Sequence, residues 1–245
     1  MDDFRYLSYY YDQFVGADYP RISSYIDRKL KCANLSGNYG VDLGCGSGTL
    51  TFLLADLGYD MIGIDRSEGM LMQAMEKKAP DSTVLFSQQD LTDFELYGPA
   101  DFMVSTLDCL NYLEDASEVE KLIKNCSAFL KPNGLFILDF NSLYKYERIL
   151  DGQNYVFETE DTFCVWENEF EGDHMYYDLT YFARQGDKYQ RFEDHQMQTY
   201  FDVGLIKDIL EKQGFEILSL EDDYFERCVT SDTQRYVLTA RKRRI

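Results

Sequence analysis

The residues best suited to chemistry lie in one short segment, Tyr39 to Gly48, which ends in three alternating glycines. An apolar strand is predicted to end just before Gly44, and Gly46 and Gly48 follow it. Glycine lacks a Cβ, so the chain can turn sharply there and a ligand can touch the main chain. Apolar residues at helical spacing begin directly after the loop. A strand, a glycine loop and a helix expose free backbone N–H groups, which suits a ligand with an anionic group.

A carboxylate follows these glycines by about 20 residues, at the end of the next predicted strand, where an acid can hold ribose hydroxyls. This residue is Asp65. A nicotinamide-binding loop would need a small residue at position 49, but this chain has Thr49 there and its third glycine at 48. A Tyr-x-x-x-Lys pair downstream of the glycine loop is also lacking. These departures disfavour a nicotinamide-dependent oxidoreductase, which stays open as an alternative.

The segment from Asp42 to Gly48 reads acid-x-Gly-x-Gly-x-Gly and resembles motif I of the class I S-adenosylmethionine (SAM)-dependent methyltransferases. Three later segments resemble further motifs of this family in the expected order: Gly63–Ser67, Asp90–Leu91 and Leu130–Leu135. The matches cover roughly the first 140 residues, with the spacing of a doubly wound sheet. The resemblance implies SAM as the cofactor and methyl transfer as the activity.

The resemblance also implies which residues contact the cofactor. Asp90 would accept a hydrogen bond from the adenine amino group, and the backbone of Thr106–Tyr112 would line the methionine half. Tyr11 belongs to a Tyr-Asp segment that folds over the cofactor mouth in relatives, although such rings could instead only pack. The expected cofactor-binding residues are Tyr11, Asp42, Gly44, Gly46, Gly48, Asp65, Arg66, Asp90, Leu91 and Leu107.

The elements that position these residues alternate between strands and helices, which predicts a doubly wound α/β fold. Ser67 and Asp202 are the expected N-caps of two of the helices. The resemblance implies a Rossmann-like seven-stranded sheet of order 3-2-1-4-5-7-6. We expect strands at 39–43, 60–64, 82–86, 101–105, 135–140, 215–220 and 235–240. We divide the chain into an N-terminal helical and SAM-binding core (1–143), an inserted antiparallel β subdomain (144–202), and a C-terminal helix and β hairpin (203–245).

The insertion is predicted from a change of period, because apolar and polar residues alternate there as in strands. Three strands are expected, near Phe163–Phe170, Met175–Arg184 and Tyr189–Tyr200. A meander of three strands must bury one face to be stable, and the nearest surface is the end of the parent strands. We therefore expect a lid over the reaction site, with Trp166 and Tyr181 facing the acceptor, or alternatively a dimerisation sheet.

The composition of the chain limits the classes of partner that the protein is expected to bind. The chain has 245 residues, a formal net charge of −20 and a pI near 4.4. So acidic a surface disfavours nucleic acid, and the Pro-Pro-aromatic signature of base-modifying methyltransferases is missing. No apolar run could span a membrane, and the six scattered cysteines indicate reduced thiols without structural zinc. We expect a cytoplasmic, metal-independent protein, monomeric or homodimeric.

The expected reaction needs little acid–base chemistry, because a sulfonium methyl is already electrophilic. The enzyme must hold a nucleophile in line with the S–CH₃ bond and keep water out. His195 and Asp108 are the candidate catalytic residues, and Tyr112, Trp166 and Tyr181 the candidate acceptor-binding residues. The predicted function is methyl transfer to nitrogen or oxygen of a small molecule. A non-catalytic SAM-binding or partner-binding module remains the other alternative.

Overall fold

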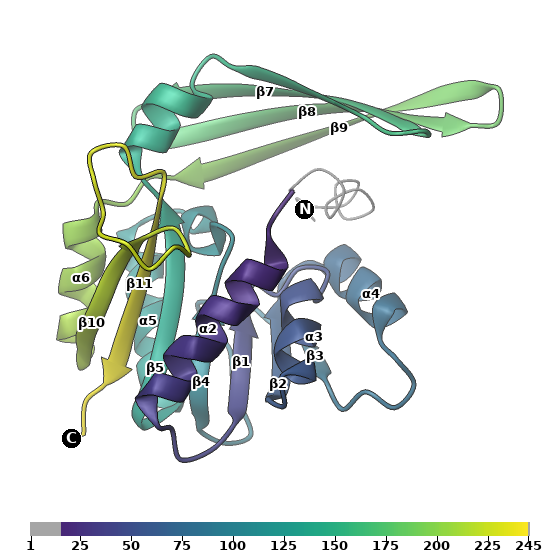
Figure 1. Ribbon diagram of the computed structural model, residues 1–245. Helices are drawn as coiled ribbons and strands as arrows, with labels where there is room; N and C mark the ends of the chain where they lie inside the picture. The colour runs from purple at the N-terminus through teal and green to yellow at the C-terminus, as the bar shows by residue number, and fades with distance from the viewer. Residues whose placement is uncertain (1–15, 245) are drawn as a thin grey trace.

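The computed structural model describes residues 16–244, which form a large mixed sheet and a smaller antiparallel sheet. The smaller sheet lies above the carboxyl ends of the parallel strands of the large one (Figure 1). The order of the large sheet is β10-β11-β5-β4-β1-β2-β3, which confirms the predicted topology. Strands β3, β2, β1, β4 and β5 are parallel, and β11 pairs antiparallel with β5. The bounds are β1 Tyr39–Leu43, β2 Asp60–Asp65, β3 Leu85–Gln88, β4 Ala100–Ser105, β5 Leu130–Asn141, β10 Phe215–Asp222 and β11 Arg235–Lys242.

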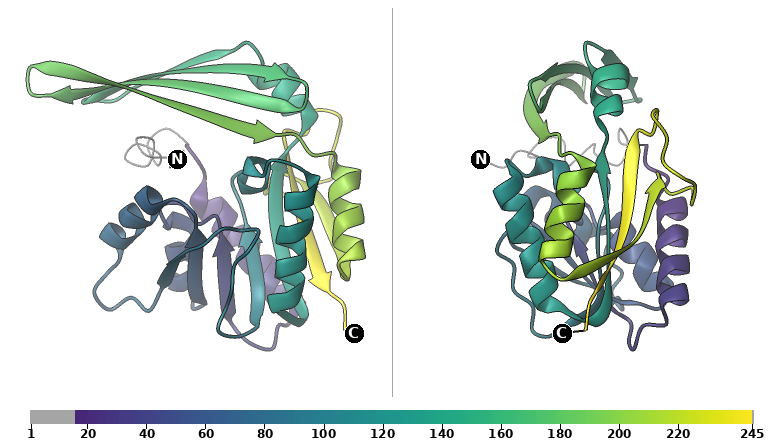
Figure 2. Two further views of the ribbon diagram at one scale, coloured as in Figure 1. Left: turned by 180° about the vertical axis from the view of Figure 1, so that it is seen from behind. Right: turned by 90° about the vertical axis from the view of Figure 1, so that its left-hand side faces the viewer.

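Helices cover both faces of this sheet, as Figure 2 shows in its right-hand view. The central strand β4 is buried along its whole length, as expected of a strand between two helical layers. One layer contains α2 (Tyr19–Ala33) and α3 (Thr49–Asp56), and the other contains α5 (Ala116–Phe129) and α6 (Val203–Lys212). Helix α4 (Glu68–Lys77) begins after Ser67, and Asp202 precedes α6. Both predicted N-caps are confirmed, because each side chain accepts a backbone N–H of its helix.

Two strand boundaries were predicted wrongly. The third strand was expected at 82–86, but β3 runs from Leu85 to Gln88 and pairs Gln88 with Asp65. Strand β3 lies at the sheet edge, where its register follows β2 rather than its own apolar pattern. The fifth strand begins at Leu130, because the expected turn at Asn133 is absorbed as an irregularity within the strand, with φ of 66°.

The insertion has four strands instead of the three expected. It opens with a short helical segment, η2 (Lys145–Leu150), and continues with β6 (Asn154–Glu158), β7 (Thr162–Glu171), β8 (His174–Gln185) and β9 (Lys188–Thr199). Strand β6 gave no alternating signal because its residues are almost all exposed. Strand β8 alternates buried and less buried positions along most of its length, as predicted, and β9 alternates in its second half.

The small sheet lies above the carboxyl ends of the parallel strands (Figures 1 and 2). Hydrogen bonds of buried side-chain amides connect it to the large sheet. Asn111 donates to the Thr199 carbonyl (2.8 Å) and accepts from the Asn141 backbone N–H (2.9 Å). Gln198 accepts from Asn141 (3.1 Å) and from the Tyr146 and Tyr177 hydroxyls. The end of β5 and the end of β9 are therefore joined through buried, hydrogen-bonded side chains. No helix among residues 16–244 is long and apolar enough to cross a membrane.

This joint predicts a stability effect. Replacing Asn111 with Ala leaves the Asn141 N–H and the Thr199 carbonyl buried without partners, at about 1–3 kcal/mol for each unpaired group. We expect Asn111→Ala to lower the free energy of unfolding by about 2–4 kcal/mol in urea denaturation. Asn38→Ala, which removes one exposed side-chain bond to the Gly58 carbonyl, is the matched control and should cost less than about 1 kcal/mol. Equal losses in the two variants would contradict this account of the joint.

Candidate active site

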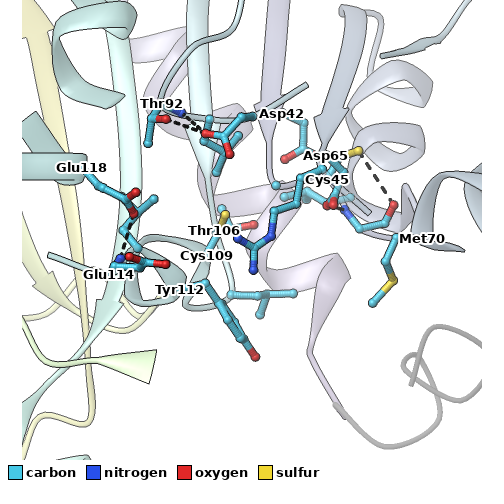
Figure 3. Close-up of a pocket in the computed structure, with 18 of the residues that line it drawn as sticks. Asp42, Cys45, Asp65, Met70, Thr92, Thr106, Cys109, Tyr112, Glu114 and Glu118 are labelled. Atoms are coloured by element: carbon cyan, nitrogen blue, oxygen red, sulfur yellow. Dashed lines mark hydrogen bonds between the residues drawn. The ribbon is translucent and has the colours of Figure 1, made fainter. Parts of the chain in front are cut away.

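The first cavity lies at the carboxyl ends of β1, β2 and β4, around the glycine loop (Figure 3). In Figure 3, Asp65 and Met70 lie on one side, Glu114 and Glu118 on the other, and Thr106, Cys109 and Tyr112 between them. Most of the predicted cofactor-binding residues line it, namely Asp42, Gly44, Gly46, Asp65, Arg66, Asp90, Leu91 and Leu107. Tyr11 lies outside the described residues, so its predicted role stays a prediction.

The glycine loop is held in a conformation that other residues would strain. Gly44, Gly46 and Gly48 have φ of 75°, 53° and 76°, in the left-handed region. A Cβ at Gly44 would lie 2.0 Å from the Cys109 sulfur, so the loop closes against the segment after β4. Gly48 does not line the first cavity. A Cβ there would meet Phe86 at 2.8 Å, so this glycine allows the loop to pack on the third strand.

Asp65 ties the end of β2 to the loop. Its carboxylate accepts the backbone N–H groups of Gly46 (2.8 Å) and Ser67 (2.9 Å). Burial raises the pKa of Asp65, and these two hydrogen bonds act in the opposite direction. Each carboxylate oxygen has a second lone pair, so the same group can also accept hydroxyls from a ligand.

Asp90 lies at the far end of the first cavity, beyond β3. One of its carboxylate oxygens accepts both the backbone N–H (2.7 Å) and the hydroxyl (2.6 Å) of Thr92. The other oxygen makes no hydrogen bond with the residues that the structure describes. Asp90 therefore closes its own turn and keeps one oxygen for a ligand donor.

A strained turn follows β4 and separates the first cavity from a second one. Leu107 and Asp108 have φ of 57° and 64°, and their N–H groups donate to the two oxygens of Asp139 (2.8 and 2.7 Å). The Asp108 carboxylate accepts two bonds from Arg235 (3.1 and 2.6 Å) and lies 3.6 Å from the Lys145 ammonium. Burial alone would raise the pKa of Asp108, but these two cations hold it far below its usual range.

The second cavity lies under the small sheet, between β6–β9 and the turn after β4. Tyr112 and Trp166, two of the three predicted acceptor-binding residues, line it, and Tyr112 donates to the Gln196 side chain (2.9 Å). Tyr181 does not line it, because its ring is buried in the apolar cluster of the small sheet. Leu107 and Tyr112 line both cavities, so these two residues form a boundary that the cavities share.

His195 lies outside both cavities. Neighbouring residues on a strand point to opposite faces, so His195 faces away from the side that Gln196 presents to the second cavity. Its ring is 75% exposed and bonds the Asp178 carboxylate. That bond raises the pKa of His195. Its catalytic role stays a prediction, without support from its position.

Several site residues were not predicted from the sequence. The first cavity also contains Cys45, Met70, Thr92, Glu114 and Glu118. Met70 looks like an ordinary core residue of its helix, so no local signal distinguishes it. The place of Arg235 at the site follows from the sheet topology alone. Strand β11 pairs with β5 so that Arg235 lies opposite Asn141, at the same end of the sheet as Asp108. Among the described residues, no cluster of histidine, cysteine or acidic side chains could hold a metal ion.

Known proteins resemble this chain over nearly its whole length. The family profile described as "Methyltransferase domain" matches residues 41–134. A protein of Geobacillus sp. (strain WCH70) named as a methyltransferase is 30% identical over 242 residues, which cover 96% of this chain and 98% of the relative. The crystal structure of a SAM-dependent methyltransferase from Clostridium acetobutylicum has a TM-score of 0.89 at 28% identity and covers 97% of this chain and 98% of its own.

A more distant structure shares the fold. The sugar N-methyltransferase KedS8 from Streptoalloteichus sp. superposes with a TM-score of 0.78 at 20% identity. The match covers 96% of this chain and 93% of that one, so it includes the small sheet. At this identity the likeness concerns the fold.

Asp42 provides a pH-dependent test of the site. It is fully buried, donates nothing, and accepts the Thr51 hydroxyl (2.6 Å), while burial raises its pKa to about 7. Because the folded-state pKa exceeds the unfolded one, its favourable contribution is present below the unfolded value near pH 4 and lost as the pH rises through 7.

In Asp42→Asn the amide oxygen can still accept from Thr51, but the side chain no longer titrates. We therefore expect the free energy of unfolding of the ligand-free variant, relative to that of the wild type, to be higher at pH 8 than at pH 5. Each unit of pKa difference corresponds to about 1.4 kcal/mol, which sets the scale. Thermal unfolding at the two pH values measures the difference, with Asp60→Asn at an exposed position as the control. An equal effect of Asp42→Asn at both pH values would show that the charge of this carboxyl is unimportant.

Proposed function

We propose a function for this chain, which belongs to the class I S-adenosylmethionine-dependent methyltransferase family. In this proposal the protein methylates nitrogen or oxygen of a small-molecule acceptor bound in the second cavity. Family membership makes SAM its cofactor and ends the nicotinamide alternative. The observation that carries the proposal is that Leu107 and Tyr112 line both cavities. We infer that the methyl group passes from the first cavity to the second beside these two residues, at the edge of the strained turn.

The first cavity fits SAM on its own chemistry. The loop of Gly44 and Gly46 leaves backbone exposed beside it, and Asp65 keeps lone pairs for ribose hydroxyls. The free oxygen of Asp90 suits the adenine amino group, and the turn at Leu107 would border the methionine half. The bound cofactor supplies an electrophilic sulfonium methyl group.

The residues of the chain then have two tasks, to orient the acceptor and to exclude water. The small sheet covers the second cavity, and Tyr112 links the turn to that sheet through Gln196. Asp108 is a poor proton acceptor because Arg235 and Lys145 stabilise its charged form. We therefore assign Asp108 to the positioning of the turn and not to proton transfer.

The fold comparison agrees with a small acceptor. KedS8 shares both sheets with this chain, and its name describes it as an N-methyltransferase that acts on a sugar. Nothing in that agreement selects nitrogen over oxygen for this protein, so the proposal keeps both.

Asp65 tests the cofactor half of the proposal. Asp65→Ala removes two charge-assisted hydrogen bonds to the ribose, worth about 1.5–3 kcal/mol each, and should weaken SAM binding at least about tenfold. Titration calorimetry with SAM measures the effect, with circular dichroism to check folding. Asp60→Ala, at the exposed start of the same strand, is the control and should bind normally. Undiminished affinity in Asp65→Ala would remove the ribose assignment.

Removal of the small sheet tests the acceptor half. Among residues 16–244, those that line the first cavity all lie between positions 19 and 118, so a Gly/Ser linker in place of 153–199 should leave SAM affinity within about threefold. Methyl incorporation from labelled SAM into a metabolite extract should fall by about two orders of magnitude or more, because orientation and water exclusion are lost. The control replaces only the hairpin tip, residues 185–188.

The alternative role of the small sheet is dimerisation. If excision converts a dimer into a monomer and methyl incorporation survives, the sheet is an interface and not a lid. Light scattering on the same samples separates these outcomes.

A further inference from the structure

The face of the small sheet that borders the second cavity carries a row of polar side chains. Asn168 on β7, Tyr177 on β8 and Gln196 on β9 are directly opposite one another in the strand register. Residues in register on neighbouring strands share one face of the sheet. All three line the second cavity, and each is at most 6% exposed. The row therefore forms one wall of the cavity.

This wall contains polar atoms that the described part of the chain does not satisfy. Asn168 donates to the Gln153 carbonyl, and the Gln196 oxygen accepts the Tyr112 hydroxyl. The Asn168 amide oxygen, the Gln196 amide nitrogen and the Trp166 indole nitrogen have no hydrogen-bond partner among residues 16–244. One acceptor and two donors are thus left for a ligand, since buried polar groups are normally paired.

The charges around the same cavity are already compensated. Arg235 and Lys145 face Asp108, and Arg21 pairs with Asp223 at 2.9 Å. Asp18 lies 4.0 Å from Arg21. A carboxylate, phosphate or ammonium group on the ligand would find no free opposite charge among these residues, and its desolvation would go uncompensated.

Aromatic rings supply the rest of the wall. Trp166 packs against Phe157 (5.9 Å between ring centroids) and edge-on against Tyr177 (5.7 Å). The wall therefore combines apolar ring surface with separate donors and acceptors, which selects a ligand that is apolar on its ring carbons and polar on its substituents.

We propose that the acceptor presents to this wall an uncharged saturated ring with several hydroxyl groups, a sugar or a cyclic polyol. This inference rests on the proposed function and specifies its substrate class. A hydroxyl can donate to Asn168 and accept from Gln196 or Trp166. Hydroxyls project above and below a saturated ring and so reach groups that stand up from a sheet. A flat heterocycle lying on the wall has its polar atoms only in its own plane.

The chain contains one tryptophan, and it is in this wall, so intrinsic fluorescence reports on the second cavity directly. The probes are the methyl glycosides of glucose, galactose and mannose, compared with benzoate and adenine, in the presence of saturating S-adenosylhomocysteine. We expect at least one glycoside to change the Trp166 fluorescence saturably. Benzoate and adenine, which are flat rings without a sugar, should not.

Gln196→Glu keeps the oxygen that Tyr112 bonds and replaces the donor nitrogen by an acceptor. It should weaken glycoside binding at least about tenfold, since a donor to a hydroxyl is lost and a charge is added. Its affinity for S-adenosylhomocysteine should stay unchanged, because Gln196 does not line the first cavity. Gln190→Glu adds the same charge on the exposed part of β9 and should bind glycosides normally.

Three results would overturn the proposal: no saturable response to any glycoside, saturable binding of benzoate or adenine instead, or equal glycoside affinity in the Gln196→Glu and wild-type proteins. Methyl incorporation in a metabolite extract is measured separately. If it persists while the glycosides fail, the ring assignment is wrong and the methyltransferase proposal stands. If no extract component is methylated, the proposed function fails as well.

Discussion

One buried carboxylate, that of Asp139 near the end of β5, organises the site. It accepts the N–H groups of Leu107 and Asp108, which both have left-handed backbone conformations. Such conformations cost free energy for non-glycine residues and persist only where surrounding contacts enforce them. The Tyr224 hydroxyl also donates to Asp139, and Arg235 lies 3.8 Å away. The turn that separates the two cavities is therefore fixed by a single acceptor with four neighbours.

This arrangement explains why the C-terminal hairpin belongs to the site. Tyr224 lies between β10 and β11, and Arg235 opens β11, yet both act on a turn more than a hundred positions earlier in the chain. The antiparallel insertion of β11 beside β5 is what brings them there. The hairpin thus completes the sheet and holds the turn at Leu107 and Asp108 in place.

The glycine loop and the acidic residues at the strand ends could be predicted from sequence, because each is recognised by a pattern only a few residues long. Asp65 and Asp90 lie where their motifs place them. The rest depends on long-range pairing that no short pattern encodes. Sequence alone makes Asp108 a catalytic candidate, but only the register of β11 reveals that Arg235 pairs with it. His195 and Gln196 are neighbours on β9, and the strand's orientation alone decides which of them faces the cavity.

The central claim is that the methyl group crosses from the first cavity to the second between Leu107 and Tyr112. A crystal structure with sinefungin, a SAM analogue that carries an amine at the position of the transferred methyl, tests it most directly. The account predicts that this amine points through the opening between Leu107 and Tyr112 toward Trp166 and Gln196. An amine that points instead away from the small sheet, with Tyr112 closing the opening, would contradict the account.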